Sequence, residues 1–271
     1  MRTVLLALAV LLSVLPRPGA AEPGLDLVDI PGGELAMGDA AGEADEAPRT
    51  VAVGPFRIMR HEVTNREFAA FHETDAAAGR RTDPERAGAG WVWTRRWRSV
   101  QGADWRHPFG PESSIAGRGD HPVVQVSARD AAAFCAFHGL RLPTEAEWEF
   151  AARGPEWRRY PWGDASPEEG GRRRANFGTV ECCAADDADG HLETAPVGRF
   201  PSGASPFGVM DMAGNVWEWT ASRLAGAPDR VILKGGGWGN DAYCLRIGYR
   251  HTNPPDIGLG MVGFRCAGAA P

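Results

Sequence analysis

From Pro155 to the C-terminus the chain shows no sustained helical period, and this restricts its fold more than any other feature. Gly, Pro, Asp and Asn interrupt the segment repeatedly, and the whole sequence contains 35 Gly, 21 Pro and 10 Trp. Such punctuation predicts short strands joined by long ordered loops. Loops of this length need disulfides or bound ions to hold them in a compact domain.

The helical signals lie before Pro155, where three capping-box sequences place a hydroxyl residue three positions ahead of an acid. They are TNRE (Thr64 to Glu67), SARD (Ser127 to Asp130) and TEAE (Thr144 to Glu147). The predicted helices cover residues 65–73, 128–138 and 145–152. Gly139 and Gly154 stand where they can end the second and third helices.

The first 21 residues have the pattern of a secretory signal peptide. Arg2 is followed by the 12-residue apolar run VLLALAVLLSVL and then by small residues up to Ala21. The run is too short to span a bilayer, and no later stretch is apolar enough to do so. We therefore expect cleavage after Ala21 and an exported protein, periplasmic or secreted, with one domain over residues 22–271 and no membrane contact.

The net charge restricts the class of binding partner, and the cysteine content indicates disulfide bonds. Removing Arg2 and Arg17 from the 29 basic side chains leaves 27 against 35 acidic ones, a net charge near −8. This balance argues against nucleic acid as a partner. Five cysteines in an oxidising compartment indicate disulfides, with one thiol left over.

Two oxygen-rich sequences in the second half could bind a hard cation. DMAGNVWEW (Asp211 to Trp219) supplies two carboxylates and a glycine turn, and ANF (Ala175 to Phe177) with DADGH (Asp187 to His191) supplies a second set. Calcium takes six to eight oxygens and mixes carboxylate, amide and backbone donors. Ordinary turns use the same residue types, so both readings stay open at this point.

Several sequence strings together resemble the formylglycine-generating enzyme, or sulfatase-modifying factor, family. They are GADWRHPFGPESSI, HPVVQVSARDAAAFCAFHGLRLPTEAEWEFAARG, YPWGD, MDMAGNVWEWT, KGGGW and VGFRCA, and they occur in this order. The resemblance runs from about Val28 to the C-terminus. It implies a single mixed α+β domain with little regular secondary structure, distantly related to C-type lectins.

The resemblance also implies two calcium sites and one disulfide. The disulfide would join Cys135 to Cys266. One calcium site would use the side chains of Asn176 and Asp189 with the carbonyls of Phe177 and His191. The other would use the side chains of Asp211 and Glu218 with the carbonyls of Gly214 and Val216.

The sequence departs from the family at the residues that perform its reaction. In formylglycine-generating enzymes, two cysteines five positions apart follow the KGG element, bind copper and use oxygen to convert a substrate cysteine in a C-x-P-x-R segment to an aldehyde. Here Asn240 stands in place of the first cysteine, and Cys244 follows four positions later. Gly237 replaces an active-site serine. An amide oxygen is a poor Cu(I) ligand, so we do not expect the two-cysteine copper route.

Cys244 has three further interpretations because Cys182 and Cys183 are adjacent in the loop of the first calcium set. Cys244 could form a disulfide with one of them, share a metal site with one of them, or stay outside a Cys182–Cys183 bridge. A role as catalytic nucleophile requires a base within hydrogen-bond reach.

We weigh three functions. The first is an oxidoreductase of this superfamily, carrying copper or iron, that modifies an exported protein, peptide or peptide-like metabolite in a groove formed by Trp238, Asn240, Cys244 and Arg246. The second is a calcium-stabilised binding module that has lost chemistry, and the missing cysteine favours it. The third is a maturation factor for a periplasmic metalloenzyme.

Overall fold

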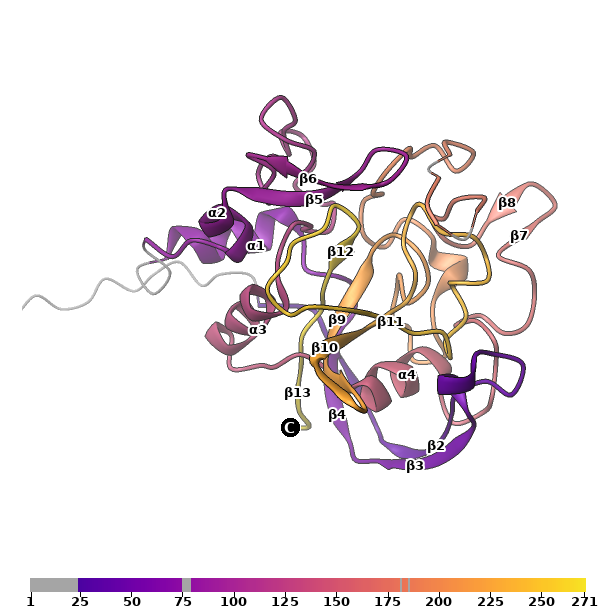
Figure 1. Ribbon diagram of the computed structural model, residues 1–271. Helices are drawn as coiled ribbons and strands as arrows, with labels where there is room; N and C mark the ends of the chain where they lie inside the picture. Colours follow the sequence, from indigo (N-terminus) through magenta and orange to yellow (C-terminus); the bar gives the residue numbers. More distant parts are fainter. Residues whose placement is uncertain (1–23, 75–78, 181, 185) are drawn as a thin grey trace, which may run out of the picture.

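A four-stranded sheet forms the centre of the computed structural model (Figure 1). Its strand order is β11 (His251–Asn253), β10 (Ala227–Lys234), β9 (Trp217–Leu224) and β12 (Val262–Gly263). β9 and β10 form an antiparallel hairpin, whereas β12 runs parallel to β9. The sheet therefore brings the last part of the chain against the segment that begins at Trp217.

The structure describes residues 24–74, 79–180, 182–184 and 186–271. The predicted signal peptide, residues 1–21, lies outside this part of the chain. Within it, no helix has the length and apolar character needed to cross a bilayer.

A second sheet and three hairpins surround the central sheet. The second sheet has the order β1 (Leu27–Ile30), β4 (Phe56–Met59) and β13 (Ala267–Ala269), so the N-terminal and C-terminal strands share one partner. The hairpins pair β2 (Gly33–Met37) with β3 (Arg49–Val53), β5 (Ala89–Trp93) with β6 (Trp97–Gln101), and β7 (Glu168–Glu169) with β8 (Arg172–Arg173). Short 3-10 turns cover Ala44–Glu46 and Pro201–Gly203.

The three predicted helices are confirmed to within one residue. They are α1 (Asn65–Glu73), α3 (Ala128–Phe137) and α4 (Glu145–Arg153), and each begins with the predicted capping box. A fourth short helix, α2 (Asp83–Ala87), was not predicted, and it is capped in the same way by Thr82 and Glu85. After Pro155 the described residues form only short strands, loops and one 3-10 turn, as expected.

Two apolar clusters account for most of the core. One packs α1 and α3 against the central sheet through residues such as Phe68, Phe134 and Trp219. The other packs α4 against β2 and β4 through Trp148 and Phe150. Figure 1 shows α4 between the central sheet and the β2–β3 hairpin. The architecture is a single mixed α+β domain with few helices and many short strands, which confirms the predicted fold class.

The disulfide implied by the family resemblance is present. Cys135 of α3 is bonded to Cys266, 131 residues later, with 5.5 Å between the two Cα atoms. Both residues are fully buried. The bond joins the helical half of the domain to the segment between β12 and β13.

Removing this disulfide should strongly destabilise the protein because it closes a very long loop. In the chain-entropy model, a loop of this size contributes about 4–5 kcal/mol. We expect the double variant C135A/C266A to lose that much free energy of unfolding, measured by urea denaturation. The matched control is C182S/C183S, which removes a bond between adjacent residues. The explanation is wrong if both double variants lose the same amount.

Candidate functional site

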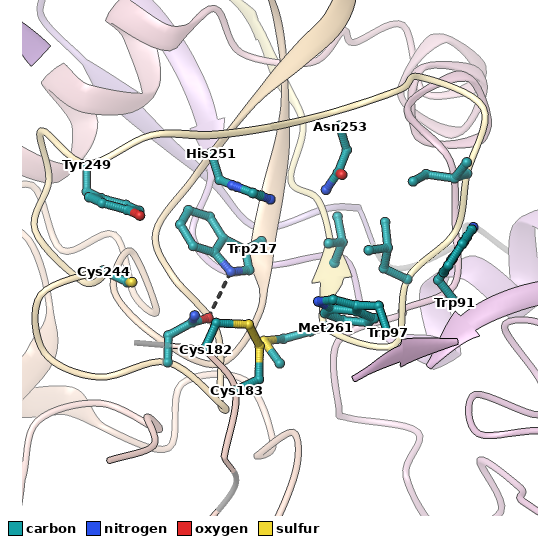
Figure 2. A pocket seen from close by; sticks show the side chains of 14 residues that line it. Trp91, Trp97, Cys182, Cys183, Trp217, Cys244, Tyr249, His251, Asn253 and Met261 are labelled. Atoms are coloured by element: carbon teal, nitrogen blue, oxygen red, sulfur yellow. Dashed lines mark hydrogen bonds between the residues drawn. A yellow bond between two sulfur atoms is a disulfide. The ribbon is translucent and has the colours of Figure 1, made fainter. Parts of the chain in front are cut away.

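A cavity of about 450 Å³ opens beside the edge of the central sheet (Figure 2). We call it the aromatic pocket. Its lining comes from the β5–β6 hairpin, β9, the loop at 182–183 and the long segment from 240 to 262. The residues are Trp91, Trp97, Cys182, Cys183, Trp217, Asn240, Cys244, Tyr249, His251, Asn253, Ile257, Leu259, Met261 and Val262.

The lining is apolar and aromatic, with few polar groups. None of the described residues that line it is Asp, Glu, Lys or Arg. Ligand cavities commonly have this character, with a small number of polar groups that orient the ligand. In Figure 2, Tyr249, His251 and Asn253 follow one segment, the Cys182–Cys183 pair lies across from them, and Trp217 lies between. The pocket therefore suits an uncharged group.

His251 is the titratable imidazole of this lining. It is exposed to solvent, and its ring lies 5.6 Å from the ring of Trp217, centre to centre. The partial burial lowers the pKa of His251, and the nearby Arg230 lowers it further. This direction of shift favours the uncharged form of the imidazole.

Asn240 is held in the pocket wall by two hydrogen bonds. Its Oδ1 accepts one from the Trp217 indole Nε1 at 2.9 Å and one from the Gly237 amide at 3.1 Å, and its exposed fraction is 4%. Figure 2 draws the bond to Trp217. The oxygen at the position of the family's first cysteine is thus already used inside the protein.

Met261 explains why glycine stands in place of the family's serine. A Cβ added at Gly237 would lie 2.5 Å from Cγ and 2.8 Å from Sδ of Met261, closer than real contacts allow. A Cβ at Gly239 would lie 2.8 Å from Cε of the same side chain. A serine therefore does not fit at position 237 unless Met261 moves.

The three cysteines outside the Cys135–Cys266 bond all line the pocket. Cys182 and Cys183 form a disulfide with each other, and Cys244 lies outside both disulfides and is buried. Of the three interpretations left open by the sequence, this is the one with Cys244 outside a Cys182–Cys183 bridge. The expected bond from Cys244 to Cys182 or Cys183 is not formed.

Two of the four predicted groove residues lie elsewhere. Asn240 and Cys244 line the pocket, whereas Trp238 is buried and donates from Nε1 to the Gly260 carbonyl at 3.3 Å. Arg246 is also buried, and its guanidinium pairs with Asp39 at 2.7 Å and Glu46 at 2.9 Å. These two carboxylates lie about 200 residues earlier in the chain, and no local pattern indicates that they neutralise Arg246.

The second predicted calcium set lies in a buried charge cluster. Arg265 donates to both carboxylate oxygens of Glu218 at 2.7 Å, and Asp211 accepts from the Gly198 amide at 2.6 Å. Burial raises the pKa of Asp211, and Glu218 adds to the rise.

Glu62, which sequence analysis missed, completes the cluster. Burial raises its pKa well above the usual range, and Asp211 and Glu218 raise it further. It accepts from the Asn215 amide and from the Val216 backbone. Three carboxyl groups thus lie around one guanidinium in the protein interior, and burial together with their mutual repulsion raises the pKa values of Glu62 and Asp211.

The first predicted calcium set is partly engaged by the protein. The Asn176 amide donates to the Glu193 carbonyl, and the Phe177 carbonyl accepts from Arg173. Asp189 accepts from the His191 amide through Oδ1, while its buried Oδ2 has no hydrogen-bond partner among the described residues. Burial raises the pKa of this carboxyl.

A redox metal does not fit the pocket as it stands. Across the described residues, no group of three or more His, Cys, Asp or Glu side chains is arranged to hold a metal ion. The Asn240 oxygen already accepts two hydrogen bonds, and two of the three pocket cysteines are bonded to each other. The two-thiolate copper site has no second thiolate here, and the described lining offers iron one imidazole and no carboxylate.

Comparisons with known proteins point to one family. The profile of the sulfatase-modifying factor enzyme 1-like domain matches residues 14–270. The formylglycine-generating enzyme of Streptomyces coelicolor is 42% identical, over 94% of this chain and 96% of its own. The inactive C-alpha-formylglycine-generating enzyme 2 of Bos taurus is 38% identical, over 91% and 89%. Among solved structures, PvdO from Pseudomonas aeruginosa superposes with a TM-score of 0.68 at 28% identity, over 90% of this chain and 94% of its own.

Proposed function

Because this chain belongs to the sulfatase-modifying factor enzyme 1-like family, we propose that it is an oxidoreductase acting at the aromatic pocket. Its substrate would be an exported protein, peptide or peptide-like metabolite with an uncharged reactive group. The observation that carries the proposal is the position of Cys244. Cys244 follows the KGG element as the family's second cysteine does, one position short of the family spacing, and it lies in the wall of the aromatic pocket.

The pocket residues have separable tasks in this proposal. Trp91, Trp97 and Trp217 would bind and desolvate the substrate group, since burying aromatic surface is their main contribution. Asn240 fixes the orientation of the Trp217 indole rather than binding a metal. Cys244 would be the reacting side chain, with the uncharged His251 also available in the lining.

The reaction would not follow the two-cysteine copper route. That route needs a thiolate where this chain has Asn240, and the Asn240 oxygen is occupied by two donors. Any redox metal would have to use a ligand set other than the family's. We therefore leave copper or iron out of the proposed mechanism.

A second candidate function is a calcium-stabilised binding module without catalysis. The same pocket could bind an apolar group and release it unchanged. The loss of one family cysteine favours this function, and so does the similarity to a relative named as inactive.

We also propose that the mature protein works outside the cytoplasm, after export. The two disulfides support this, because such bonds persist in oxidising compartments. Two calcium ions would stabilise the loops after Pro155, one at Asn176, Phe177, Asp189 and His191 and one at Asp211, Gly214, Val216 and Glu218. Two observations support the proposed sites: Oδ2 of Asp189 has no partner among the described residues, and three carboxyl groups gather around Arg265.

Calcium should raise the thermal stability of protein refolded after chelation. At a free concentration 100 times the dissociation constant, one site contributes about 2.7 kcal/mol. We expect Asp189→Asn and Asp211→Asn each to lose part of the rise in melting temperature, and the double variant to lose all of it. Asp229→Asn, at an exposed hairpin position, is the control and should retain it. A melting temperature that does not respond to calcium contradicts both sites.

Oxidation of a thiol-containing peptide should depend on Cys244. We expect Cys244→Ser to lower the rate of oxygen-dependent conversion by at least about 100-fold while the protein stays folded. Aldehyde formation by mass spectrometry, together with oxygen consumption, measures the rate on C-x-P-x-R peptides and on peptides with an aromatic neighbour. Urea denaturation verifies that the variant is folded.

Two outcomes oppose the oxidoreductase proposal. If Cys244→Ser converts peptide as fast as the unaltered protein, Cys244 is not the reacting group. If neither protein converts any peptide with added copper, iron or no metal, yet both bind the peptide equally, the binding module is the better description.

A further inference from the structure

We propose that the Cys182–Cys183 disulfide is a thiol-exchange site that accepts an uncharged, preferably aromatic, thiol bound in the aromatic pocket. This site is separate from the oxidation proposed at Cys244. The thiol exchange depends on the shape and chemistry of the aromatic pocket. It does not require that the protein oxidise a peptide.

The two disulfides of the protein lie in contrasting surroundings. Cys135 and Cys266 are fully buried in the core. Cys182 and Cys183 instead line the cavity, with Cys182 exposed and Cys183 only 6% exposed. A thiol that enters the pocket can therefore reach Cys182, whereas neither sulfur of the other disulfide is accessible. Access is one of the factors that set the rate of thiol–disulfide exchange.

The neighbouring backbone fixes this disulfide against the pocket wall. The Ala184 amide donates to the Gly239 carbonyl at 2.9 Å, and the Gly178 amide donates to the Asn240 carbonyl at 2.7 Å. A Cβ at Gly239 would lie 3.4 Å from Cβ of Cys183. The loop that carries the two cysteines is thus held beside the segment that carries Asn240 and leads to Cys244.

The exposure of the two residues assigns their roles in the exchange. The thiolate of the bound compound attacks Sγ of Cys182, and a new sulfur–sulfur bond forms there while the Cys182–Cys183 bond breaks. Cys183 leaves as a thiolate and takes up a proton, which balances the proton lost by the incoming thiol. The incoming sulfur is oxidised, the Cys183 sulfur is reduced, and no other oxidant is needed.

The lining determines which thiols are accepted. Among its described residues none is Asp, Glu, Lys or Arg, and the pKa of His251 is lowered by burial and by the nearby Arg230. Moving a charged group into such surroundings is costly, whereas an aromatic group gains contact with Trp91, Trp97 and Trp217. An uncharged aromatic thiol should therefore react faster than an anionic thiol of similar acidity.

The test compares two thiol probes on the full chain with both disulfides formed. Benzyl mercaptan and 2-mercaptoethanesulfonate are added without oxygen, the reaction is quenched with acid, and peptide mapping by mass spectrometry locates each adduct. We expect benzyl mercaptan to form a mixed disulfide at Cys182 at least about tenfold faster, a difference of 1.4 kcal/mol in activation free energy. The Cys135–Cys266 bond should stay intact, which provides an internal control.

Variants separate pocket binding from simple exposure of a disulfide. Trp97→Ala removes part of the aromatic lining and should reduce the tenfold preference for benzyl mercaptan. Trp157 is an exposed tryptophan outside the pocket, and Trp157→Ala should leave the preference unchanged. Equal rates for the two probes, an adduct on Cys183 instead of Cys182, or opening of both disulfides together would each overturn the proposal. The thiol-exchange experiment excludes oxygen and does not depend on peptide oxidation. A failed oxidation assay at Cys244 would therefore leave the thiol-exchange proposal unaffected.

Discussion

The ion pair between Glu218 and Arg265 is the contact on which the rest of this domain depends. Arg265 also donates to the carbonyls of Met59 and Met210, and Glu218 accepts from the Trp148 indole at 2.9 Å. One guanidinium therefore connects the central sheet, the second sheet, a loop and, through Glu218, helix α4. The adjacent Cys266 adds a covalent link to α3. A charge pair buried this deeply is costly to break, because either partner left alone would be an uncompensated buried charge.

This central arrangement positions the aromatic pocket. Trp217 directly precedes Glu218 in β9, so fixing Glu218 also fixes the indole that binds Asn240. The parallel pairing of β12 with β9 brings Met261 and Val262 to the same place. Met261 then fills the space that the family's serine would need beside Gly237. Gly237 leaves room for Met261, and its amide donates to Asn240. The residues that differ from the family at positions 237 and 240 therefore form a packed, hydrogen-bonded arrangement.

The sequence predicts some of this architecture well because the relevant signals are local. A capping box is a contact between residues three apart, so Thr64, Ser127 and Thr144 mark their helices directly. The helix after Thr82 carries the same signal in TDPE, but its five residues show no helical period that would have drawn attention to it. The Cys135–Cys266 bond was predicted through the family resemblance alone.

The remaining features depend on contacts between distant segments, which the sequence does not reveal. The partners of Arg246, Asp39 and Glu46, lie about 200 residues away. Trp91 and Trp97 reach the pocket from a hairpin that carries no family motif. Glu62 stands beside ordinary loop residues in the sequence, and only the fold places it next to Asp211 and Glu218. Pairing among Cys182, Cys183 and Cys244 likewise depends on where two distant loops meet.

The most direct test of this account is the free energy of unfolding of Arg265→Met, measured by urea denaturation with tryptophan fluorescence. The substitution leaves the buried Glu218 carboxylate without its ion-pair partner, and we expect a loss of about 3–5 kcal/mol. Arg57→Met, which removes a more exposed guanidinium bonded to the Ala269 carbonyl, should cost less than about 1 kcal/mol. A loss for Arg265→Met no larger than that for Arg57→Met would contradict the central role given to the buried pair.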